Sequence, residues 1–95
     1  MARFRFEWDP EKNRLNRAKH GVSFQAARQA FFDEHRLIHD DAAHGGSEKR
    51  YFCVGRARGG VMSVRFTHRL DRIRIIGAGY WRKGRDLYEK ENHLH

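Results

Sequence analysis

Several features that would place this sequence among secreted, membrane or metal-binding proteins are missing. Cys53 is the single cysteine, so no internal disulfide can form, and no Cys-x-x-Cys metal site exists. No apolar run approaches the length of a membrane span, and the N-terminal segment lacks the apolar core of a signal peptide. We therefore expect a protein of the reducing cytoplasm with no membrane partner.

Linkers and repeats are missing as well. Proline occurs once, at Pro10, and no Gly/Ser-rich or low-complexity stretch divides the chain. The 95 residues suffice for one modest core without staples, so we expect a single domain over residues 1–95. The seven histidines do not combine an i,i+3 or i,i+4 pair with a third ligand. Accordingly, neither a metal nor another cofactor is expected.

Negative charge is scarce in the second half of the chain. Twenty Lys and Arg against twelve Asp and Glu give a net charge of +8. Residues 23–48 hold two cations and five anions, whereas residues 49–85 hold eleven cations and one anion. Such a basic half favours a polyanionic partner, most plausibly nucleic acid; a solvated basic surface without a ligand is the alternative.

Hydrophobic periodicity predicts the N-terminal elements. Residues 3–8 alternate and indicate a strand with Phe4, Phe6 and Trp8 on one face. A first helix is expected from Pro10, capped by Asp9 and ended by Gly21, with Leu15 and Ala18 as its apolar side. Ser23 should cap a second helix over residues 24–32, whose buried stripe is Phe24, Ala27, Ala30 and Phe31.

The rest of the chain predicts four strands and a helix. We expect strands over residues 36–40, 49–57, 61–69 and 72–76, a loop over 41–48, a turn over 58–60, and a final helix over about 80–91. The fold class is therefore α+β with the order β-α-α-β-β-β-β-α, and the short connections favour an antiparallel meander.

Alternation in the last strands predicts a basic sheet face. Met62, Val64 and Phe66 point toward the core, and the opposite face carries Arg65, Thr67, Arg69, Arg72 and Arg74. Arginines in a row across adjacent strands repel one another. A bound phosphate chain would relieve that repulsion.

The ordered motifs resemble the BrnT toxins of type II toxin–antitoxin systems. The N-terminal half carries Trp8-Asp9, Asn16, the segment "KHGVSF" over residues 19–24, and Asp33. The C-terminal half carries Glu48, Arg50, Tyr51, Gly55, Gly60, Val64, Thr67, Arg69 and "RII" over residues 74–76. The resemblance covers residues 4–89.

This resemblance implies a fold and a function. The fold is RelE-like, a small antiparallel sheet with helices packed on one face. The implied activity is that of a metal-independent endoribonuclease, which halts translation and growth by cleaving RNA. The implied partner is a BrnA-like ribbon-helix-helix antitoxin that forms a neutralising, operator-binding complex.

The last strand departs from the pattern of these toxins. Many of them end "RIISARxAxxxERxxYE", and this chain has Gly79 at the position of their arginine. Gly77 and Gly84 replace the serine and a glutamate, while Arg85 and Tyr88 are kept. We expect the two strand-end glycines to form a turn at which the backbone approaches a phosphate.

Metal-free RNA cleavage predicts which side chains take part in catalysis. It requires a base for the ribose 2′-hydroxyl, a cation for the pentavalent phosphate and an acid for the leaving 5′-oxygen. Glu48, Arg50 and Arg69 should converge at one end of a hairpin, and they form the leading group. Lys19 and His20 are further candidates. The alternatives are a cross-strand ion pair for Glu48 and compensation of the helix dipole for His20.

RNA-binding candidates lie on the basic face and in the turn after it. They are Arg65, Arg72, Arg74, Tyr80, Trp81, Arg82 and Lys83. The two aromatic rings follow glycines amid cations, where rings can stack on exposed bases; they could equally anchor the last helix to the sheet. The competing function is a non-catalytic RNA- or antitoxin-binding module, which keeps the basic face but lacks the arginine replaced by Gly79.

Overall fold

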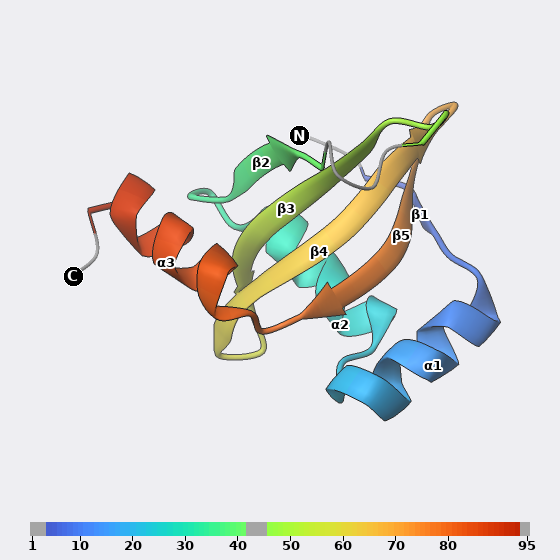
Figure 1. The fold of residues 1–95 in the computed structure, drawn as a ribbon, viewed down its shortest axis with the longest axis horizontal. Helices are drawn as coiled ribbons and strands as arrows, with labels where there is room; N and C mark the ends of the chain where they lie inside the picture. Colours follow the sequence, from blue (N-terminus) through green and yellow to red (C-terminus); the bar gives the residue numbers. More distant parts are fainter. Residues whose placement is uncertain (1–3, 42–45, 94–95) are drawn as a thin grey trace.

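A computed structural model describes residues 4–41 and 46–93, so residues 42–45 of the expected loop lie outside it. The described elements are β1 (Phe6–Glu7), α1 (Pro10–His20), α2 (Phe24–Ala27), the 3-10 helix η1 (Arg28–Phe32), β2 (Leu37–Asp40), β3 (Arg50–Ala57), β4 (Gly60–Arg69), β5 (Arg72–Gly79) and α3 (Arg82–Glu91) (Figure 1). The α+β class and the expected element order are confirmed. None of the helices in these two stretches is long and apolar enough to cross a membrane.

The sheet is mixed rather than wholly antiparallel. Its five strands lie in the order β1-β5-β4-β3-β2, and β2 to β5 form the expected antiparallel meander. The edge strand β1 instead runs parallel to β5, with Phe6 beside Ile73. The helices and the strands β2 to β4 lie between β1 and β5 along the chain. No short hairpin therefore forces β1 and β5 to pair antiparallel.

The first helix has the expected ends but not the expected buried side. The carboxylate of Asp9 accepts the N–H of Glu11 at 3.0 Å, and Gly21 ends the helix at φ 70°. Leu15 is 51% exposed, whereas Asn16 is buried. The Asn16 amide donates to the carbonyls of Val22 and Ala78 at 2.9 Å each. The predicted apolar side is therefore wrong, because a buried polar anchor holds α1 to β5.

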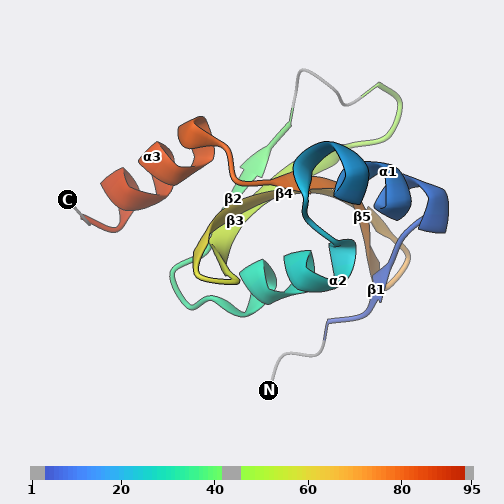
Figure 2. The same ribbon diagram turned by 90° about the horizontal axis from the view of Figure 1, so that it is seen from below.

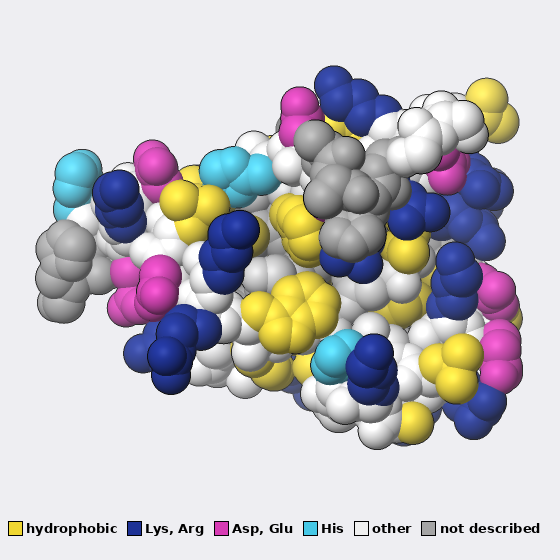
Figure 3. Space-filling view, in the orientation of Figure 1, with side chains coloured by type: hydrophobic (Ala, Val, Ile, Leu, Met, Phe, Trp, Pro, Cys, Tyr) yellow, Lys and Arg dark blue, Asp and Glu magenta, His cyan; other side chains and the backbone are white. Residues whose placement is uncertain are grey.

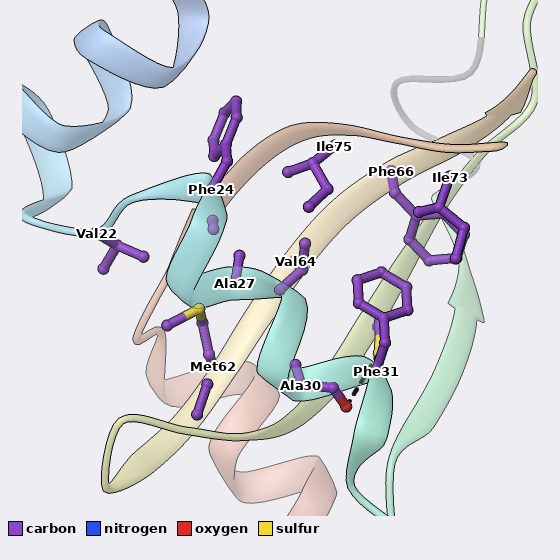
Figure 4. Packing of buried hydrophobic residues seen from close by; sticks show 13 residues of the cluster. Val22, Phe24, Ala27, Ala30, Phe31, Met62, Val64, Phe66, Ile73 and Ile75 are labelled. Atoms are coloured by element: carbon purple, nitrogen blue, oxygen red, sulfur yellow. Dashed lines mark hydrogen bonds between the residues drawn. The ribbon is translucent and has the colours of Figure 1, made fainter. Parts of the chain in front are cut away.

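The second helix carries the predicted buried stripe. Ser23 caps it by accepting the N–H of Ala26, and Phe24, Ala27, Ala30 and Phe31 are all buried in the main core (Figure 4). Its second half tightens into η1, which lies directly on β3. A Cβ at Gly55 would overlap the Ala30 carbonyl oxygen, so this close approach requires glycine.

Helices lie on both faces of the sheet, contrary to the expectation of one covered face. The core face packs against α2 and η1 and carries Met62, Val64, Phe66, Ile73 and Ile75, whereas α1 lies toward the other side (Figure 2). We call that other side the front face; it carries Arg50, Phe52 and Val54 of β3, Ser63, Arg65 and Thr67 of β4, and Arg72, Arg74, Gly77 and Gly79 of β5. Helix α3 covers one end of the front face, where Tyr88 packs against Val54 and Val61.

The junction between β5 and α3 differs from its prediction. The strand continues through the glycines, with Gly77 beside Arg65 and Gly79 beside Ser63, and a bulge interrupts the register between Arg65 and Phe66. Helix α3 starts at Arg82, two residues later than expected. The expected glycine turn is therefore absent. The strand extends through both glycines because each of them pairs with a residue of β4.

Candidate nucleic-acid interface

The front face is a grid of side chains fixed by the strand register. One row contains Arg50, Thr67 and Arg74, and the next contains Phe52, Arg65 and Gly77. Figure 3 shows this face, with hydrophobic surface between α3 and α1 and Lys and Arg side chains around it. The alternation predicted from the sequence therefore places all the expected β4 and β5 arginines on one side.

Carboxylates of the same chain pair with these arginines. Arg65 Nε lies 2.9 Å from the buried carboxylate of Asp41, and Arg69 Nε lies 3.1 Å from Glu48 Oε1. Glu7 contacts both Arg74, at 2.8 Å, and Arg72, at 3.7 Å. Carboxylates distant in sequence therefore supply anions against the repulsion for which we expected a bound phosphate chain from the sequence.

Two of the three leading catalytic candidates, Glu48 and Arg69, meet as an ion pair at the β4–β5 hairpin end. Arg69 Nε donates a hydrogen bond to Glu48 Oε1, which agrees with the alternative interpretation of Glu48 as the partner in a cross-strand ion pair. Arg50 lies one row away beside Thr67, and its buried Nε has no hydrogen-bond partner in the described part of the chain. Arg72 and Arg69 are register partners. This end of the face is thus an arginine cluster held by carboxylates.

Lys19 and His20 meet a different part of the face. They line a hollow of about 290 Å³ between α1 and β5, which we call the α1 hollow, together with Arg65 and Trp81. The His20 ring stands edge-on to the Trp81 ring, with centroids 5.4 Å apart. Arg65 and Arg69 are four residues apart on β4, or roughly 13 Å. The α1 hollow and the hairpin end are therefore separate parts of the front face.

Trp81 fills the space that a side chain at position 79 would need. A Cβ at Gly79 would lie 2.7 Å from the indole ring. Trp81 is also the N-cap residue of α3, although its side chain makes no capping bond. The glycine that replaces the arginine of the BrnT pattern therefore leaves room for the indole of Trp81 on the front face.

Tyr80, Arg82 and Lys83 point to different places. The Tyr80 hydroxyl donates to the Ala57 carbonyl at 2.9 Å, so Tyr80 anchors the junction to the β3–β4 hairpin. Arg82 lines a hollow beside that hairpin, together with Arg56. Lys83 lines a hollow over the front face. The predicted turn cluster is thus divided between two sides of α3.

Helix α3 is fixed by a bond from Tyr88. Its hydroxyl donates to Asp33 Oδ2 at 2.6 Å. Burial would raise the pKa of Asp33, but hydrogen bonds from Tyr88 and from the N–H groups of Arg56 and His35 lower it overall. Burial and the bond to Asp33 raise the pKa of Tyr88. These contacts determine where Trp81 and Lys83 lie.

Cys53 belongs to the core and not to the site. It is fully buried with its Sγ 3.7 Å from the Ala30 carbonyl oxygen, and burial raises the pKa of its thiol to about 12. Within residues 4–41 and 46–93, no three His, Cys, Asp or Glu side chains converge into a group that could hold a metal ion.

Sequence reasoning missed three residues of the front face. Phe52 shares the face with Arg50, and the alternation along β3 would have located it. His39 faces Phe52 from β2. The ion pair of Asp41 with Arg65 crosses from the loop to β4, and no local pattern in the sequence predicts it.

The fold and this face define a small α+β protein whose basic surface suits an anionic polymer. A family model described as "Ribonuclease toxin, BrnT, of type II toxin-antitoxin system" matches residues 8–84. The chain belongs to this family of ribonuclease toxins. A search of the curated proteins found no match to the sequence.

Proposed function

We propose that this chain is an endoribonuclease that cleaves RNA without a metal ion, and that the reaction takes place at the α1 hollow. The observation that carries the proposal is the meeting of Lys19, His20 and Arg65 beside Trp81. Among the described residues, the hollows on either side of α3 lack this combination: the one beside Arg82 has no lysine or histidine, and the one beside Lys83 has no arginine. These are the groups that a phosphodiester transfer needs.

Each residue would have a distinct task. His20 takes the proton of the ribose 2′-hydroxyl, whose oxygen attacks phosphorus while the bond to the 5′-oxygen breaks. Arg65 faces the phosphate with a guanidinium whose Nε lies 2.9 Å from the Asp41 carboxylate. Lys19 stabilises the developing charge, and a protonated side chain or water returns a proton to the 5′-oxygen.

The hairpin end would hold the neighbouring backbone. Arg50, Arg69, Arg72 and Arg74 bind phosphates next to the one that is cleaved, and Glu48 orients Arg69. Glu48 is also the second candidate for the base, because a carboxylate can accept the 2′-hydroxyl proton. Two variants distinguish the candidates: His20→Gln and Glu48→Gln.

The test combines growth and RNA. Induction of the wild type should arrest growth and fragment cellular RNA, and the purified protein should cleave a single-stranded RNA in the presence of EDTA. His20→Gln should reduce cleavage by about 10²-fold or more, while Glu48→Gln stays within a few-fold of the wild type. Arrest with intact RNA would contradict the enzyme; loss with Glu48→Gln alone would move the base to the hairpin end.

A ribbon-helix-helix antitoxin is the proposed partner. The front face is where an inhibitor must act, so an acidic or helical segment should cover Arg65 and Trp81. The complex should bind RNA more weakly than the toxin alone, and it should bind its operator DNA through the antitoxin. A complex that leaves the front face open would require a different mode of inhibition.

A binding module without catalysis is the second candidate. It is favoured by the internal pairing of Arg65, Arg69, Arg72 and Arg74, which leaves fewer free guanidinium groups for a transition state. This function would be favoured if the purified protein binds RNA but does not cleave it, and if its induction in cells without the antitoxin leaves cellular RNA intact.

A further inference from the structure

A second hollow adjoins Trp81 on the side away from α1. It has a volume of about 550 Å³, within the range of small-ligand sites. Its lining comes from β2, β3, β4 and α3, together with Asp41 after β2 and Trp81 before α3. It is mainly apolar, with Phe52, Trp81 and Leu87, and it also carries His39, Ser63, Lys83 and the carboxylates of Asp40 and Asp41. We call it the α3 hollow. None of the proposed catalytic residues lines it.

Two buried polar atoms in this hollow have no partner. Ser63 is 3% exposed, and neither its Oγ nor Nε2 of His39 has a hydrogen-bond partner in the described residues. Burying a polar atom without a partner is unfavourable, because the atom gives up its hydrogen bonds to water and gains none. Two such atoms in one apolar hollow are therefore matched to a ligand that carries its own donors and acceptors.

The backbone keeps this hollow open. A Cβ at Gly84 would overlap Ser63 Oγ, so glycine lets α3 approach β4 without filling the space with a side chain. Phe52 lines the same hollow, and the Arg65 guanidinium carbon lies 5.1 Å from the centre of the Phe52 ring. The aromatic rings of Trp81 and Phe52 therefore both line the hollow.

The α1 and α3 hollows differ in chemistry in the same way as the parts of a nucleotide. The α1 hollow is cationic and suits a phosphate, whereas the α3 hollow is mainly apolar, with two aromatic rings, two unpartnered polar atoms and the side chains of Asp40, Asp41 and Lys83. A nucleobase has an apolar face for stacking and polar edges for hydrogen bonds. Lipid chains lack such edges, and a bare polyphosphate lacks such a face.

We propose that the α3 hollow receives one unstacked nucleobase of single-stranded RNA. Its face stacks on Trp81 and its edge bonds to Ser63 and His39. Lys83 contacts the phosphate on the solvent side. The proposal rests on RNA as the ligand of the proposed function, but it does not depend on cleavage.

Binding of mononucleotides tests the proposal directly. In a Trp8→Phe variant, Trp81 is the only tryptophan, and its fluorescence reports what stacks on it. The four ribonucleoside 5′-monophosphates are titrated beside ribose 5-phosphate, which has the same phosphate and no base. At least one nucleotide should quench Trp81 and bind about fivefold or more tightly than ribose 5-phosphate.

Two substitutions locate the bound base. Ser63→Ala and His39→Ala should each weaken nucleotide binding several-fold and leave ribose 5-phosphate binding unchanged. His35→Ala is the matched control, because His35 is exposed and does not line the hollow. Unfolding midpoints of all the variants show whether a loss comes from misfolding.

The outcomes separate this proposal from the proposed function. Base-dependent quenching in a protein that cuts no RNA would support the α3 hollow as a nucleobase site and contradict the proposed ribonuclease activity. Cleavage of RNA by a protein that binds ribose 5-phosphate as well as it binds the nucleotides would retain the enzyme and overturn the α3 hollow. Equal losses with His39→Ala and His35→Ala would also overturn it.

Discussion

At the scale of the residue, Gly79 and Trp81 act as one unit. The indole lies where the side chain of residue 79 would be, so a larger residue there has to displace it. We expect Gly79→Ala to lower the free energy of unfolding by about 1 to 3 kcal/mol through overpacking and to change the fluorescence of Trp81.

The matched control lies two residues earlier on the same strand. A Cβ at Gly77 would have Asn16 Oδ1 as its neighbour at 3.9 Å, an ordinary contact. Gly77→Ala should therefore leave stability within about 0.5 kcal/mol of the wild type. Equal effects of the two substitutions in denaturant unfolding would show that Trp81 does not rest on position 79.

Asn16 gives a second prediction at this scale. Its amide donates to two carbonyls and accepts the N–H of Ala78 at 3.2 Å. Asn16→Leu leaves those buried backbone groups without partners, so unfolding should become easier by about 2 to 4 kcal/mol. Leu15→Ala is the control and should change little, because Leu15 is half exposed. A larger loss with Leu15→Ala would restore the apolar side predicted for α1.

At the scale of the element, local chemistry and the hydrophobic stripe of the second helix were predictable, and the buried side of α1 was not. Asp9, Gly21 and Ser23 act within their own turns, so the sequence located both helix starts. The burial of Asn16 depends on a carbonyl 62 residues away, and no periodicity shows it. Likewise the glycines of β5 looked like a turn, because their strand partners on β4 lie outside the local window.

The candidate site divides in the same way. Alternation placed the β4 and β5 arginines on one face. The ion pairs with Glu7 and Asp41, and the hollow that joins His20 to Trp81, depend on the mutual placement of β1, α1, α3 and Asp41. Single-sequence patterns describe each of these elements alone and contain no information on how they approach one another.

The position of α3 should depend on pH through Asp33 and Tyr88. Because hydrogen bonds lower the folded-state pKa of Asp33, its contribution is present above the ordinary Asp value and is lost as pH falls through the lowered folded value. Tyr88→Phe should reduce stability by about 1 to 2 kcal/mol at pH 7 and by much less near pH 2. Chemical denaturation of both proteins at the two pH values measures this. A difference that persists in acid would mean that the carboxylate does not carry the interaction.

At the scale of the whole molecule, the net charge of +8 sets how RNA binds. Cations from α1, β4, β5 and α3 surround one face, so counterion release should dominate the affinity. The logarithm of the binding constant should fall linearly with the logarithm of salt concentration, with a slope that reflects several neutralised phosphates. Affinity that does not change with salt would contradict an electrostatic face.

Net charge alone, however, does not show on which side of α3 the RNA binds. Substitutions of the neighbours Arg82 and Lys83 do. Both are exposed cations in the first turn of α3, but Lys83 borders the front face and Arg82 borders the hollow beside the β3–β4 hairpin. Alanine at either position removes one charge from the same turn, so a uniform field predicts equal losses of RNA affinity.

If RNA lies on the front face, Lys83→Ala should weaken binding several-fold more than Arg82→Ala and reduce the salt slope by about 1, because one phosphate contact is lost. RNA titrations at three salt concentrations measure both quantities. A larger loss with Arg82→Ala would instead move the RNA to the hairpin side of α3, where Arg56 and Arg85 are the neighbouring cations.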